Sequence, residues 1–193
     1  MSKIAFIIPG FGCPTKNKEY QQIAGFFKKK NIKPILIETD WKRNTHLEYV
    51  VQFKEQYLRN VDNGDQVYVL GFSFGAMTAC ITAPELKPTM QILCSLSPFF
   101  KEDIPLVKSW WIKYHGKHRK SVFEKLSFSD IAKKTVCKTI ILAGNKEGNE
   151  VEHRAKDAKK KIKNSELVFI DGVNHNIADE GYLKKIKEII EKI

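Results

Sequence analysis

A serine lies between two glycines in the pentapeptide GFSFG at 71–75. An apolar run precedes this pentapeptide and a stretch of small, helix-forming residues follows it. The sequence therefore predicts a sharp strand-to-helix turn with Ser73 at its apex. In such a turn the serine backbone is strained, its hydroxyl projects clear of the sheet, and both flanking positions are too crowded for a side chain. Ser73 is the first candidate nucleophile, and an ordinary glycine-rich turn is the alternative interpretation.

A serine hydroxyl becomes a good nucleophile only when a base takes its proton, and histidine is well suited to that role. His175 follows the last predicted strand, within DGVNHN at 171–176. Loops at the carboxyl ends of parallel strands converge on one edge of the sheet, so His175 can meet Ser73 there. We therefore predict that His175 is the base. The remaining histidines are interpreted as surface or core residues of predicted helices and of a basic segment: His46, His115, His118 and His153.

The imidazole in turn needs an acid that orients it and stabilises its charged form. This acid is expected after the strand predicted at 138–143, where the chain reads GNKEGNE at 144–150. Glu147 and Glu150 are the candidates in that stretch. The alternative interpretation of both is a solvated acidic cluster at the start of a helix.

Short apolar runs rich in Ile, Val and Leu predict the strands that must position these residues. They lie at 3–8, 32–37, 66–70, 90–95, 138–143 and 166–170. Continuous rather than alternating apolar character is typical of strands buried on both faces. Helical periodicity between them predicts four apolar faces: Tyr20, Ile23, Phe26 and Phe27; Leu47, Val50, Val51, Leu58 and Val61; Val151, Ala155, Ala158 and Ile162; Leu183, Ile186, Ile189, Ile190 and Ile193. We predict a single doubly wound α/β domain over 1–193, with about six mostly parallel strands.

The segment 98–135 interrupts this alternation and predicts a small helical cap inserted between two strands. Aromatic and basic residues gather in it, with no acidic residue between Asp103 and Glu124: Val107, Trp110, Trp111 and Tyr114 on one face, and Lys108, Lys113, Lys117, Arg119 and Lys120 around them. One hypothesis is that this surface holds an acyl or aromatic group beside an anionic one. The favoured alternative is that the aromatic residues pack the cap onto the sheet while the lysines face water.

The motifs and their order resemble the α/β-hydrolase superfamily, in the form of a small esterase-like serine hydrolase with a minimal lid. The matching pieces are GFSFG, the turn at 144–147 and the late Asn-His at 174–175, in the order serine, acid, histidine. The resemblance covers essentially the whole domain. It implies a triad of Ser73, His175 and Glu147, with Glu147 at a position where most members carry Asp. Some members take the acid after the preceding strand, so Asp103 joins Glu150 as an alternative.

The same resemblance implies an oxyanion hole formed by two backbone N–H groups. By position these belong to Phe74 and to Phe11, in a loop where this chain has Pro-Gly at 9–10 and most relatives have His-Gly. Phe72, Trp110 and Trp111 are expected to contact the substrate. The implied function is cleavage of a small carboxylic ester or thioester through an acyl-enzyme on Ser73, with no cofactor and no metal.

Two other functions remain open. Gly-Phe-Gly at 10–12 follows the first predicted strand, as in a dinucleotide-binding domain, but Thr15 occupies the position of the third glycine. Glu38 or Asp40 would be the acidic residue of that motif. The other alternative is a non-catalytic interaction protein that has kept the hydrolase fold.

The charge indicates which classes of partner the protein binds, and the cysteine content indicates its cellular compartment. The chain has 33 basic and 22 acidic residues, a net charge of +11, yet only four of the basic residues are arginines. A lysine-rich solvated surface is therefore preferred over nucleic-acid binding, although it can attract an anionic substrate. The four cysteines are scattered, and no apolar run is long enough for a membrane span. These features predict reduced thiols in a cytoplasmic protein.

Overall fold

Six strands form one sheet in which every neighbouring pair is parallel. The computed structural model describes the backbone of residues 1–193 and all side chains except those of Ile112 and His115. In the order β2-β1-β3-β4-β5-β6, the strands are β2 (Lys33–Leu36), β1 (Lys3–Ile8), β3 (Gln66–Phe72), β4 (Met90–Cys94), β5 (Lys138–Gly144) and β6 (Ser165–Ile170). The predicted doubly wound α/β architecture is confirmed.

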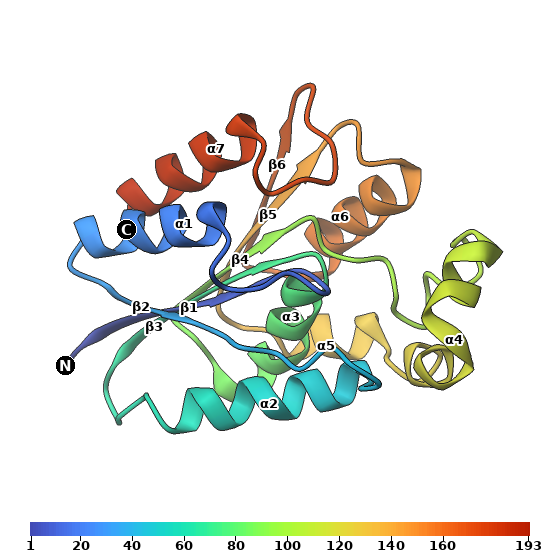
Figure 1. Cartoon of the computed structure of the whole chain (residues 1–193), viewed down its shortest axis with the longest axis horizontal. Coiled ribbons are helices and arrows are strands. Elements are labelled where there is room, and N and C mark those ends of the chain that lie inside the picture. The colour runs from blue at the N-terminus through green and yellow to red at the C-terminus, as the bar shows by residue number, and fades with distance from the viewer.

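Helices cover both faces of the sheet (Figure 1). One face carries α1 (Lys18–Lys29) and α7 (Glu180–Glu191). The other carries α2 (His46–Leu58), α3 (Phe74–Leu86), α5 (Phe128–Lys134) and α6 (Asn149–Lys161). Each central strand is therefore buried on both sides, and alternate residues of β1 contribute to the two separate cores. This two-sided burial explains why the strands appear in the sequence as continuous apolar runs.

The buried face of α2 differs from the prediction. Leu47, Val51 and Leu58 are exposed, whereas the buried residues of this helix are aromatic or imidazole side chains: His46, Tyr49, Phe53 and Tyr57. Two of these rings pack on the Phe6 ring of β1, at centroid distances of 5.7 and 5.1 Å. Large rings bury more apolar area than Leu or Val at the same helical spacing, so they decide which face turns inward. The faces predicted for α1, α6 and α7 are confirmed.

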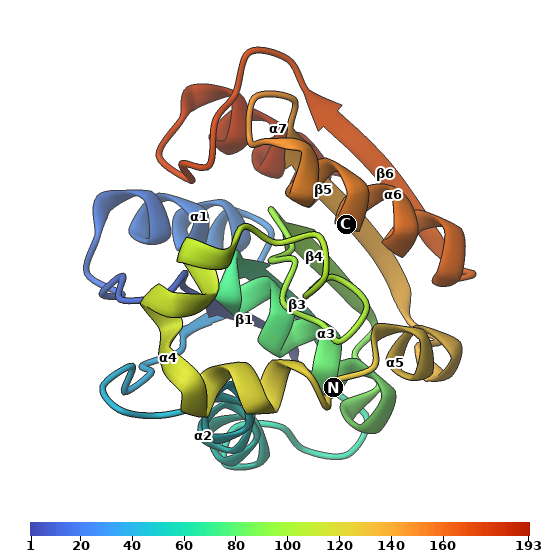
Figure 2. The ribbon, with the colours of Figure 1, turned by 90° about the vertical axis from the view of Figure 1, so that its right-hand side faces the viewer.

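The segment 98–135, predicted as a cap, contains two helices with different surroundings. Phe128 and Ala132 of α5 are buried, and this helix packs against α3 and α6 on the body of the protein. Only α4 (Ser109–Phe123) stands over the carboxyl edge of the sheet (Figure 2). Its helical backbone is broken at Gly116, where φ is 80° and ψ is 164°. A helix packed on the body and a helix over the site have the same apolar spacing. The sequence pattern therefore does not distinguish α5 from α4.

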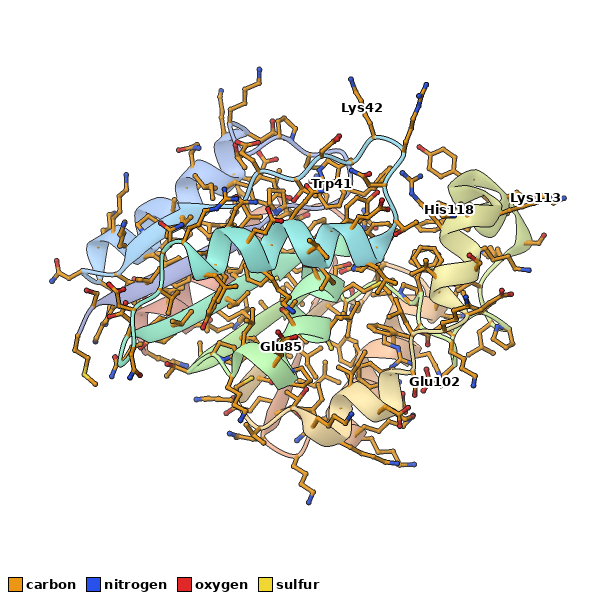
Figure 3. All side chains as sticks on the ribbon, turned by 90° about the horizontal axis from the view of Figure 1, so that it is seen from below. Trp41, Lys42, Glu85, Glu102, Lys113 and His118 are labelled. Carbon is orange, nitrogen blue, oxygen red and sulfur yellow. The ribbon has the colours of Figure 1, made fainter. Side chains whose placement is uncertain are left out.

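Arg119 fixes the second half of α4 to the loop between β2 and α2. It donates hydrogen bonds to the carbonyl oxygens of Asn44 at 2.9 Å and Trp41 at 3.0 Å. By contrast, Lys113 extends outward from α4 (Figure 3). The basic residues of the cap are therefore not equivalent, since Arg119 is a structural link and Lys113 faces solvent.

All four cysteines are free thiols, three of them buried and Cys13 partly exposed. Among the described helices, none combines the length and the apolar character that a membrane span requires.

Candidate active site

Ser73 occupies the turn between β3 and α3 in a strained backbone conformation. Its φ of 55° and ψ of −116° lie outside the regions that serine ordinarily adopts. A Cβ on Gly71 would lie 2.3 Å from the carbonyl oxygen of Gly75, and a Cβ on Gly75 would lie 2.1 Å from that of Ile8. The crowding predicted at both glycines is therefore present. The turn holds the serine at the carboxyl edge of the sheet, where β1 and β3 lie side by side and the direction of winding reverses.

The predicted side chains of Ser73, His175 and Glu147 meet at this edge, each within hydrogen-bond distance of the next. Ser73 Oγ lies 3.0 Å from His175 Nε2, and His175 Nδ1 lies 2.7 Å from Glu147 Oε2. The Glu147 side chain is fully buried, whereas the His175 side chain is 37% exposed. An imidazole held between a hydroxyl and a carboxylate in this order can take the hydroxyl proton while the carboxylate stabilises the resulting charge.

Four donors hold the Glu147 carboxylate. Oε1 accepts hydrogen bonds from the backbone N–H of Gly144 at 2.7 Å and from the Tyr182 hydroxyl. Oε2 faces His175 and the Ser95 hydroxyl. Burial raises the pKa of this carboxyl, but the hydrogen bonds outweigh burial and leave the pKa below its usual value. Glu147 is therefore an anion at neutral pH although its side chain is buried.

The two alternative acids are engaged elsewhere. Glu150 lies in the first turn of α6, and its carboxylate is 4.0 Å from Lys108 Nζ. Asp103 pairs with Arg154, at 3.0 Å from Nε and 2.5 Å from Nη2, and both side chains are buried. Arg154 also lies 4.1 Å from the centroid of the Phe128 ring. Sequence reasoning did not identify this buried ion pair, which ties the segment after β4 to α6.

The remaining histidines lie away from this series of contacts. His46 is buried under α3, with Nε2 3.2 Å from Thr78 Oγ1. His118 and His153 are exposed on α4 and α6. The side chain of His115 lies outside the described residues.

Two serines that sequence reasoning missed also reach the site. Ser95 Oγ lies 2.6 Å from His175 Nδ1, and Ser97 Oγ lies 3.2 Å from Ser73 Oγ. Both follow β4 directly and both are buried. The available signal was a pair of hydroxyl residues at alternate positions just beyond the end of a buried parallel strand, beside the strand that bears Ser73.

Phe74 and Phe11 lie side by side at the start of α3. Phe74 is the first residue of α3 and directly follows Ser73. Phe11 lies in the loop after β1, and its ring centroid is 5.3 Å from that of Phe74. The loop is fixed by hydrogen bonds from Gly10 N–H to the Tyr20 hydroxyl and from Cys13 N–H to Gly10 O, both 3.0 Å. The contact between the two rings places the loop after β1 beside the turn that bears Ser73.

Two cavities meet at Ser73, His175 and Trp111. One has a volume of about 200 Å³ and is lined further by Ser97, Pro98, Val107, Lys108, Glu150 and Val151. The other, of about 380 Å³, is mainly aromatic and is lined by Phe11, Phe72, Phe74, Trp110 and Tyr114.

The three predicted substrate contacts differ in their surroundings. Phe72 is buried, with its ring 5.0 Å from that of His175. Trp111 stacks on Phe99 at 5.6 Å and is 38% exposed, whereas Trp110 is 59% exposed. Trp111 therefore packs on the body, as the favoured interpretation expected of the aromatic residues, whereas Trp110 is largely exposed.

The features of a dinucleotide site are incomplete. The loop after β1 does not lead directly into a helix, because α1 begins only at Lys18. Thr15 is buried and donates its hydroxyl proton to Glu38, one of the two acidic residues considered for contact with a ribose. Across the described side chains, no group of three or more His, Cys, Asp or Glu residues gathers as a metal site would require.

Comparison with known proteins identifies the fold. No family model and no curated protein matches the chain. Among solved structures, Est1E from Butyrivibrio proteoclasticus superposes with a TM-score of 0.82 at 15% identity, covering 99% of this chain and 86% of Est1E. An esterase from Pyrococcus furiosus gives 0.71 at 14% identity, with 99% and 81% covered. Mouse alpha/beta hydrolase domain-containing protein 10 gives 0.72 at 14% identity, with 98% and 88% covered. The chain therefore has the α/β-hydrolase fold.

Proposed function

We propose that this protein is a serine hydrolase that cleaves carboxylic esters or thioesters through an acyl-enzyme on Ser73. The observation that carries the proposal is the series from Ser73 Oγ to His175 Nε2, at 3.0 Å, and from His175 Nδ1 to the buried Glu147 carboxylate, at 2.7 Å. The fold supports the reaction class, since an esterase is among the structures that share it.

In the acylation step, Ser73 Oγ attacks the carbonyl carbon of the substrate as His175 Nε2 takes the hydroxyl proton. Glu147 remains ionised and stabilises the imidazolium. The N–H groups of Phe11 and Phe74 hold the oxygen of the tetrahedral intermediate. The bond to the leaving alcohol or thiol then breaks, and His175 supplies the proton that the leaving group needs.

In the deacylation step, water takes the place of the leaving group. His175 Nε2 accepts a proton from the water as its oxygen attacks the acyl carbon. Collapse of the second tetrahedral intermediate returns that proton to Ser73 Oγ and releases the carboxylic acid.

The two cavities give the substrate a place on each side of the ester bond. We assign the aromatic cavity, with Phe72, Trp110 and Trp111, to a flat or acyl group, because aromatic walls favour apolar and stacked ligands. Est1E has been observed with ferulic acid bound, which supports an aromatic group in such a cavity. Lys108, at the rim of the smaller cavity, fits a substrate with an anionic part.

We further propose that residues 1–193 act as one catalytic domain with α4 as its cap. Four free thiols fit a reducing compartment such as the cytoplasm.

Ser73→Ala tests the proposed function. We expect it to abolish turnover of matched p-nitrophenyl esters and thioesters of increasing acyl length, while the thermal melt stays close to that of the parent protein. Ser165→Ala is the matched control, because Ser165 is buried at the amino end of β6 and its hydroxyl donates only to backbone carbonyls. Undiminished turnover by Ser73→Ala would refute the assignment. A parent protein inactive on the whole panel would favour the non-catalytic alternative.

A further inference from the structure

We propose that Ser95 is a positioning residue whose hydroxyl donates to Glu147 and accepts the Nδ1 proton of His175. The inference rests on the proposed function, because it concerns how His175 is kept ready to take the proton of Ser73.

The backbone holds Ser95 in place for this role. Ser95 follows β4 with a φ of 54°, a left-handed conformation that is uncommon for serine. Its N–H donates to the carbonyl oxygen of Leu142 on β5 at 2.7 Å, and the side chain is fully buried. Strained residues of this kind persist where the surrounding structure determines them strongly, and they gather at functional sites. Ser95 repeats, one strand along, the positive φ of Ser73.

Three polar atoms form a closed triangle at this point. Ser95 Oγ lies 2.6 Å from His175 Nδ1 and in hydrogen-bond contact with Glu147 Oε2, while Nδ1 and Oε2 are 2.7 Å apart. Two protons, one from the hydroxyl and one from the imidazole, must be shared among the three atoms. An ionised carboxylate only accepts, so the hydroxyl proton goes to Glu147. The serine lone pairs then face Nδ1, which must carry its proton.

This arrangement selects the productive form of the imidazole. With the proton on Nδ1, the other nitrogen, Nε2, is bare and can accept the proton of Ser73. If Ser95 instead donated to Nδ1, the proton would sit on Nε2 and the Ser73 hydroxyl could not be deprotonated. The negative charge on Glu147 therefore sets the direction in which Ser95 donates, and Ser95 in turn holds the proton of His175 in place.

Ser95 lines neither of the two cavities. Substrate binding is therefore expected to be independent of its hydroxyl. Removing one hydrogen bond to a charged group should lower kcat by about tenfold to a hundredfold, while KM stays unchanged.

The experiment compares Ser95→Ala and Ser95→Cys with the control Ser165→Ala. Two quantities are measured: kcat and KM on a p-nitrophenyl ester, and the rate at which a fluorophosphonate labels Ser73. Ser95→Cys keeps the volume of the side chain but is a weak donor, so it should resemble Ser95→Ala rather than the parent. The same Ser95→Ala change is then made in Glu147→Ala, where we expect no further loss, because the acceptor through which Ser95 acts is already gone.

Each result either supports or overturns the proposed role of Ser95. A lower kcat with constant KM, slower labelling and non-additivity with Glu147→Ala support the inference. Parent-like labelling by Ser95→Ala, full activity of Ser95→Cys, or an equal loss in both backgrounds would overturn it. A parent protein that does not label at all refutes the proposed function instead, so the two failures are distinguishable.

Discussion

Replacing Glu147 with Gln removes the charge of the buried acid and leaves its shape. The carboxylate accepts hydrogen bonds at both oxygens, from Gly144 N–H and the Tyr182 hydroxyl at one and from His175 and Ser95 at the other. An amide has only one oxygen to offer. Its NH₂ group must therefore face either the donors on Gly144 and Tyr182 or the Nδ1–H of the imidazole.

Both orientations have a measurable cost. If the NH₂ group faces His175, it favours the imidazole form with the proton on Nε2, and kcat should fall by about 10⁴-fold, or about 5 kcal/mol. If it faces Gly144, a buried donor loses its acceptor and the protein should unfold about 1–3 kcal/mol more easily. Either orientation removes the negative charge that stabilises the imidazolium, so we expect a large loss of kcat in both cases, and a loss of stability only in the second.

The assay is ester hydrolysis with active-site titration, accompanied by urea unfolding of each variant. Glu152→Gln is the matched control, because Glu152 lies on α6 five residues further along, pairs with Lys156 and lines neither cavity at Ser73. Glu152→Gln should keep kcat within a few-fold of the parent value. The reasoning fails if Glu147→Gln retains more than a tenth of the parent kcat, or if both variants lose activity equally.

Two predictions concern stability. Gly75→Ala would place a Cβ 2.1 Å from the carbonyl oxygen of Ile8, so unfolding in urea should show a loss of about 3 kcal/mol or more, and a loss below about 1 kcal/mol would contradict the crowding. Burial raises the pKa of Glu102, but hydrogen bonds from the N–H groups of Ser129 and Phe128, at the start of α5, outweigh it and lower the pKa to about 2. Because this pKa is below its unfolded value of 4.5, the stability that Glu102 contributes is present above pH 4.5 and is lost toward pH 2. Thermal melts of Glu102→Gln should therefore depend less on pH across that interval than those of the parent, and parallel curves would count against the capping role.

The sheet and the position of Ser73 could be predicted because local chemistry determines them. Two glycines flank the serine where no Cβ fits, and the runs of Ile, Val and Leu mark strands buried on both faces. The role of His175 could also be predicted, since the topology of a parallel sheet brings its loop to the same edge as Ser73.

The other parts of the site depend on distances that a sequence does not contain. Glu147 and Glu150 lie in the same turn region, and only the path of the backbone after β5 decides which carboxylate reaches His175. Ser95 and Ser97 touch the site from the neighbouring strand, and their alternate positions just beyond β4 are a weak signal that does not say which side chains they reach. The predicted buried face of α2 is wrong because Tyr49 and its aromatic neighbours bury more apolar area than Leu and Val, and they turn inward instead.

Covalent capture of the nucleophile tests the central claim most directly. The parent protein is treated with a fluorophosphonate, and the adduct is located by intact mass and peptide mapping. We predict one adduct per chain, on Ser73, formed far more slowly in Glu147→Gln and absent in Ser73→Ala. An unlabelled parent protein, or an adduct on any other residue, would contradict the account.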